Sequence, residues 1–104
     1  MIPGRNEKRQ NRIYCAAARL CLKYGYTSFD DIREAVREED REAVATYFNW
    51  SDARMWFKSC GAGCVSLRDE FTDFRPLDLV RDINNHILRY PRPSDANNNR
   101  KRPL

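Results

Sequence analysis

The sequence predicts an all-α fold, a small single domain built as a bundle of five or six helices. The chain of 104 residues is long enough to bury one hydrophobic core. It contains only four glycines and five prolines, and the prolines lie near the ends or at Pro76, so long stretches run without a turn signal. Within those stretches apolar residues recur every three or four positions, which is the period of a helix.

The first helix is expected over residues 6–24. Its apolar face consists of Ile13, Ala17, Leu20 and Tyr24. Gly25 follows directly, and glycine adopts the left-handed conformation that ends many helices without steric cost. Ser28 can then cap the next helix, whose first turn contains the acidic residues that favour the positive end of the helix dipole.

Residues 29–48 allow two interpretations, because an apolar stripe runs from Phe29 to Tyr47 with Asp40 at its centre. A buried carboxylate without a partner is costly. Either the helix breaks at "REED", with Asp40 capping a new helix, or one long helix turns Asp40 toward a gap or a partner. We favour the break, which places helices over 29–38 and 41–48.

Three more helices are expected, over 52–60, 66–74 and 77–90. Ser51 and Ser66 can cap the first two, and Pro76 suits the first turn of the last, where its missing N–H is harmless. The helix over 52–60 is predicted from four residues in helical register: Ala53, Trp56, Phe57 and Cys60.

The helical domain is expected to span residues 1–90. The remaining segment, 91–104 or "PRPSDANNNRKRPL", has no apolar periodicity and carries four basic residues against one acidic residue. We predict that it is a disordered basic tail. Residues 1–23 are also basic, whereas residues 28–45 carry seven acidic and three basic side chains. Basic ends therefore flank an acidic middle.

Composition argues against several classes of function. No run approaches about 18 apolar residues, so no membrane span and no membrane partner are expected. The basic N-terminal segment has no apolar signal core behind it, which predicts a cytoplasmic protein. In such a chain four cysteines are expected to be free thiols rather than a disulfide framework.

No metal site, cofactor or catalytic group is predicted, and the chain is not expected to be an enzyme. Cys15 and Cys21 would lie about 240° apart around a helix and cannot easily share an ion. Cys60 and Cys64 bracket three small residues and could approach each other, which leaves a redox role open. Zinc would need two further ligands, and His86 is the only histidine in the sequence.

Two stretches carry a resemblance to a known family. "AAARLCLKYGYTSFDDIREAV" is similar to the start of the DNA-binding domain of TetR-family regulators, and "TYFNWSDARMWF" resembles the end of that family's recognition helix and the start of the next helix. The matching positions are Ala17, Leu20, Gly25, Tyr26, Ser28, Asp31 and Ile32. The resemblance covers about half of the chain and implies a helix-turn-helix domain that binds DNA.

Our preferred hypothesis is a regulatory protein that binds another protein. The would-be recognition helix begins with four acidic residues, Glu38, Glu39, Asp40 and Glu42, which DNA phosphates would repel. The aromatic-rich run 46–60 offers Trp50 and Met55 as exposed contact residues, with Trp56 and Phe57 expected in the core. Arg54 and Arg75 complete the predicted contact set, because tryptophan and arginine often anchor interfaces.

Such a protein could act as an anti-activator, covering the dimer or DNA surface of a transcription factor. The alternative hypothesis is a minimal TetR-like helix-turn-helix regulator, which could be a homodimer. Nucleic acid would then be contacted through basic residues in the N-terminal arm, the 41–48 helix and the tail. These candidate contacts are Arg5, Lys8, Arg9, Arg12, Arg41, Arg100, Lys101 and Arg102.

Overall fold

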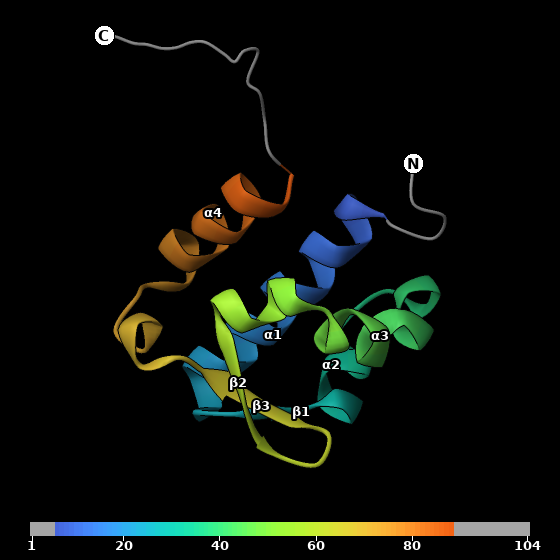
Figure 1. Ribbon diagram of the computed structural model, residues 1–104, viewed down its shortest axis with the longest axis horizontal. Coiled ribbons are helices and arrows are strands. Elements are labelled where there is room, and N and C mark those ends of the chain that lie inside the picture. The colour runs from blue at the N-terminus through green and yellow to red at the C-terminus, as the bar shows by residue number, and fades with distance from the viewer. Residues whose placement is uncertain (1–5, 89–104) are drawn as a thin grey trace, which may run out of the picture.

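A computed structural model of the chain describes residues 6–88, which form helices arranged around a small sheet (Figure 1). Four α-helices, three 3₁₀ helices and three strands alternate along these residues. In chain order they are α1 (Glu7–Tyr24), β1 (Thr27–Ser28), α2 (Phe29–Ala35), η1 (Glu38–Ala43), α3 (Val44–Asn49), η2 (Ser51–Met55), β2 (Phe57–Gly61), β3 (Cys64–Leu67), η3 (Asp69–Phe71) and α4 (Pro76–Ile87).

The all-α prediction is wrong, because the chain forms a three-stranded antiparallel sheet with the order β1–β3–β2. Strand β2 replaces the second half of the helix expected over 52–60, and β3 begins before the helix expected over 66–74 and replaces its start. Only the short 3₁₀ helices η2 and η3 remain helical in these two ranges. Gly61 and Gly63 have φ angles of 147° and 69° and reverse the chain between the two strands. Phe57 pairs with Leu67 at the far end of the hairpin.

Helix α1 agrees with the predicted range 6–24. The Asn6 side chain caps it by accepting a hydrogen bond from the N–H of Arg9 at 3.0 Å. At the other end Gly25 has a φ of 91°, and its N–H donates to the carbonyl of Cys21 at 2.7 Å. One prediction on this helix is wrong: Tyr24 does not belong to the buried face, since 61% of it is exposed.

The chain breaks after α2, as the acidic "REED" segment predicts. Helix α2 is capped by Ser28, whose Oγ accepts from the N–H of Asp31 at 3.1 Å. Val36 and Arg37 then take extended conformations, with ψ of 171° and 151°. The predicted capping role of Asp40 is wrong, because Asp40 lies inside η1 and its carboxylate turns toward the interior.

The core is centred on α1, which packs against α4, the sheet, α2 and α3 (Figure 1). Trp56 is completely buried and Phe57 is 3% exposed, so the prediction that both are core residues is confirmed. The indole Nε1–H of Trp56 donates to Oδ2 of Asp82 on α4 at 2.9 Å. Helix α4 begins with Pro76, as expected, and buries Leu79, Ile83 and Ile87. The predicted tail, 91–104, lies outside the described residues.

Replacing Trp56 by alanine should lower the free energy of unfolding by about 3–5 kcal/mol, because it leaves a large cavity beside Tyr14 and α4. Urea unfolding followed by circular dichroism measures this change. The neighbouring Met55→Ala is the control, since Met55 is 46% exposed and its removal should cost less than about 1 kcal/mol. Equal losses for the two variants would contradict the packing described.

Candidate functional site

Asp40 is a fully buried carboxylate held by two arginines of α1. Arg12 binds it with two hydrogen bonds, from Nε to Oδ2 at 2.8 Å and from Nη2 to Oδ1 at 3.0 Å. Arg9, one turn earlier on the same helix, donates from Nε to Oδ1 at 3.2 Å. The hydrogen bonds from Arg12 hold the pKa of Asp40 below its ordinary value, although burial opposes this shift.

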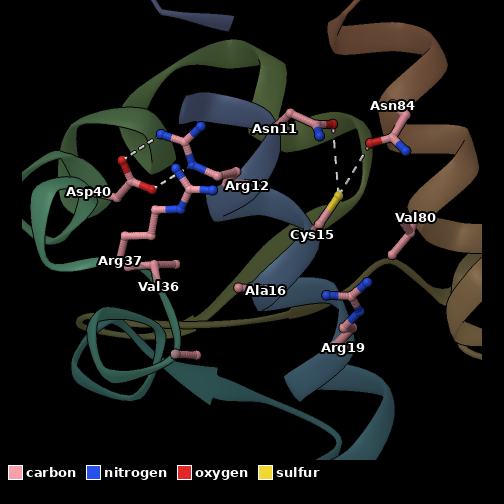
Figure 2. A pocket seen from close by; sticks show the side chains of 11 residues that line it. Asn11, Arg12, Cys15, Ala16, Arg19, Val36, Arg37, Asp40, Val80 and Asn84 are labelled. Carbon is pink, nitrogen blue, oxygen red and sulfur yellow. Dashed lines mark hydrogen bonds and ion pairs between the residues drawn. The ribbon is translucent and has the colours of Figure 1, made fainter. Parts of the chain in front are cut away.

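Next to this ion pair lies a pocket of about 380 Å³ between α1, the segment joining α2 to η1, and α4 (Figure 2). We call it the arginine pocket, because three arginines line it. Its lining consists of Asn11, Arg12, Cys15, Ala16, Arg19, Ala35, Val36, Arg37, Asp40, Val80 and Asn84. The Cys15 thiol lies 3.8 Å from Oδ1 of Asn11 and 3.7 Å from Oδ1 of Asn84, which ties the upper rim of the pocket to α4.

A second concave surface, of about 600 Å³, surrounds the two tyrosines that flank Gly25. We call it the tyrosine pocket. Its lining consists of Leu20, Tyr24, Tyr26, Asp31, Glu34 and Ala35. The left-handed turn at Gly25 separates the two tyrosines, and 61% of Tyr24 and 58% of Tyr26 are exposed. These exposed rings stand beside two exposed carboxylates.

The acidic side chains of α2 and η1 face solvent, apart from Asp40. We call the exposed members the acidic segment. They are Asp30, Asp31, Glu34, Glu38, Glu39 and Glu42. Part of this charge is locally paired, since Arg33 binds Asp30 at 2.7 Å and Arg37 lies 3.9 Å from Glu39. Because solvent screens exposed pairs of this kind strongly, they do not cancel the negative charge of the acidic segment, which presents an acidic surface.

The predicted protein-contact residues lie on several elements. Trp50 is half-buried, with its ring edge-on to Tyr47 at a centroid distance of 4.5 Å. Met55 is 46% exposed, and Arg54 is exposed and lines a third pocket of about 530 Å³. Arg75 directly precedes α4, where its Nε donates to Oδ2 of Asp78 at 3.0 Å. Their role in binding stays a prediction.

The predicted DNA-contact residues are only partly available. Arg9 and Arg12 point inward to Asp40, and Nε of Arg41 donates to the carbonyl of Arg33 at 3.0 Å. Lys8 is exposed on the first turn of α1. The other four, Arg5, Arg100, Lys101 and Arg102, lie outside the described residues. That Arg9 and Arg12 bind a buried carboxylate was not predicted from the sequence. The one signal for it was that Asp40 lies within the apolar stripe of residues 29–47.

All four cysteines are free thiols. Burial raises the pKa of Cys15 to about 11 and that of Cys21 to about 12. Cys60 is exposed on β2 and Cys64 is half-buried on β3, at the two sides of the hairpin turn. Within residues 6–88, no group of three or more His, Cys, Asp or Glu side chains is placed to hold a metal ion.

Comparison with known proteins gives no relative: no protein-family model, curated protein or solved structure matches this chain. The TetR resemblance therefore stays a prediction. Among the described helices none is long and apolar enough to cross a membrane. The function is inferred from the geometry and chemistry of the surfaces above.

Asp40→Asn should lower the free energy of unfolding by about 3 kcal/mol at neutral pH, because it leaves Arg9 and Arg12 without their carboxylate. Since the folded-state pKa of Asp40 lies below its ordinary value of 3.8, the ionised carboxylate stabilises the fold fully above that pH. This contribution is lost as the pH falls through the folded-state pKa.

The Asn variant should therefore show a flatter dependence of unfolding free energy on pH below about pH 4 than the wild type. Urea titrations at several pH values measure both effects. Asp30→Asn is the matched control, because Asp30 is exposed and forms a surface ion pair with Arg33. A loss for Asp30→Asn equal to that for Asp40→Asn would contradict the role assigned to the buried carboxylate.

The four thiols should react at different rates with a thiol reagent at about pH 8. Cys60 should be modified first because it is exposed, and Cys15 and Cys21 should be protected by burial and by their raised pKa values. Mass spectrometry of the partly labelled protein identifies the order. A Cys60→Ser variant should lose the fastest step, whereas rapid labelling of Cys15 in the folded chain would contradict the structure.

Proposed function

We propose that the chain is a non-enzymatic regulatory protein that acts in the cytoplasm by binding another protein. The observation that carries this proposal is the tyrosine pocket, where two half-exposed aromatic rings line a concave surface. Tyrosine is enriched among the residues that contribute most to protein-binding energy. Free thiols, two of them accessible, suit a reducing compartment.

The tyrosine pocket is suited to an anchoring contact because the backbone between its two tyrosines is fixed at a capped helix end. Tyr24 ends α1 and Tyr26 precedes β1, with the capped Gly25 between them. A backbone segment that is already ordered loses little conformational freedom when a partner covers the side chains it carries. Leu20 and Ala35 extend the apolar surface between α1 and α2.

The charge of the surroundings indicates the chemistry of the partner. Asp31 and Glu34 line the tyrosine pocket and continue into the acidic segment. A complementary partner presents basic and apolar side chains together. The DNA-binding surface of a transcription factor is such a surface, because it must neutralise phosphates. We therefore propose an anti-activator role, in which this chain covers the DNA surface of a transcription factor.

The chain has further candidate contact surfaces, and DNA binding is the alternative function. Met55, Arg54 and the half-buried Trp50 offer a second contact surface near η2, and Arg75 offers a further one at α4. A helix-turn-helix DNA binder remains the alternative, but the acidic segment would face the phosphates and repel them. A homodimer is compatible with either function and is measured by analytical ultracentrifugation.

Partner capture with the full chain as bait, in the native host, tests the proposal. Once the partner is identified, Tyr26→Ala should weaken its binding by about 2 kcal/mol in calorimetry, as expected for an anchoring aromatic side chain. Glu34→Lys should weaken binding by about tenfold, because it places a like charge against a basic partner.

Asp73→Lys is the matched control for Glu34→Lys: it makes the same charge change at another exposed acid and should leave affinity unchanged. Thermal unfolding of each variant verifies that the fold is retained. Sequence-specific DNA binding that is steeply salt-dependent and survives both Tyr26→Ala and Glu34→Lys would overturn the proposal in favour of the DNA-binding alternative.

A further inference from the structure

The arginine pocket is rich in hydrogen-bond donors and poor in acceptors. Three guanidinium groups, from Arg12, Arg19 and Arg37, line it together with the side-chain amides of two asparagines. Asp40 contributes the only carboxylate of the lining, and its two oxygens are already bound by Arg9 and Arg12. The lining therefore carries two net positive charges and offers N–H groups to a ligand.

The positive groups stand at two sides of an apolar floor. Figure 2 shows Arg12 and Arg37 on the side of Asp40, and Arg19 on the opposite side below Val80 of α4, with Ala16 between them. Arg19 forms no ion pair among the described residues. Arg37 makes an exposed contact with Glu39 at 3.9 Å. The charge of Arg37 also acts on Asp40, whose pKa is lowered mainly by the hydrogen bonds from Arg12. Two guanidinium groups are thus available at opposite sides of one concave surface.

Size and chemistry together define a class of ligand. A volume of about 380 Å³ falls in the range of small-molecule sites. Guanidinium groups recognise carboxylates and phosphates by paired hydrogen bonds. The short apolar side chains of Ala16, Val36 and Val80 can pack against a carbon chain between two acidic groups.

We propose that the arginine pocket binds a small organic anion with an acidic group at each end, such as a dicarboxylate. One end is held by Arg19, and the other by Arg37 with the unused N–H groups of Arg12. Asn11 and Asn84 line the rim, where their amide N–H groups add to the donors of the lining. The proposal of an anion site does not rest on the protein contact proposed above.

Titration of the ¹⁵N-labelled full chain with succinate tests this inference at constant ionic strength. Backbone amide shifts of α1 between Asn11 and Arg19, and of Arg37, should saturate with a Kd on the order of 1 mM or tighter. Arg19→Gln and Arg37→Gln should each weaken the binding by about tenfold. Acetate, with a single carboxylate, should bind more weakly than succinate.

Two controls separate a pocket from general charge attraction. Arg68→Gln removes an exposed arginine elsewhere and should leave succinate binding unchanged. Ala16→Leu keeps every charge but fills the floor of the pocket, and it should abolish saturation. No saturation below about 10 mM, or equal losses for Arg68→Gln and Arg19→Gln, would overturn the inference. Normal binding by Ala16→Leu with an unchanged fold would overturn it too.

Discussion

The ion pair between Arg12 and the buried Asp40 constrains the N-terminal half of the fold. A carboxylate with no exposed surface is tolerated only when its oxygens are bound, and Arg9 and Arg12 supply those bonds from successive turns of α1. Segment η1 must therefore approach α1 at this level. The chain leaves α2 through two extended residues, Val36 and Arg37, and the arginine pocket lies beside this connection.

Local signals in the sequence predicted those parts of the fold that local contacts determine. The end of α1 at Gly25, the cap of α2 at Ser28 and the start of α4 at Pro76 all depend on neighbouring residues, whereas the Asn6 cap of α1 was not predicted. The pairing of β3 with β1 could not be predicted in this way, because it joins Thr27 to Val65, which are distant in the sequence. The short apolar run around Trp56 fits a helix period by position, although a 3₁₀ helix and a strand place Ala53, Trp56 and Phe57 in the core and leave Cys60 exposed.

The candidate sites were harder to predict, because side chains from separate segments form them. The arginine pocket combines residues of α1, the connection after α2, and α4. Tyr24 fits the apolar face of α1 by spacing, but it is the last residue of that helix, and its ring lies in the exposed tyrosine pocket with the ammonium of Lys23 5.2 Å from its centroid. The charges of residues 1–23 predict a basic arm, whereas Arg9 and Arg12 of this segment turn inward and bind Asp40.

The structure has one acidic and one basic surface, although the net charge of the chain is +4. Ala35, near the end of α2, lines both pockets, with carboxylates on one side and guanidinium groups on the other. The carboxylates of the tyrosine pocket favour a basic protein surface, and the guanidinium groups of the arginine pocket favour a small anion. The two surfaces meet in the exposed contact of Arg37 with Glu39 at 3.9 Å, which solvent screens strongly, so each surface keeps much of its own charge.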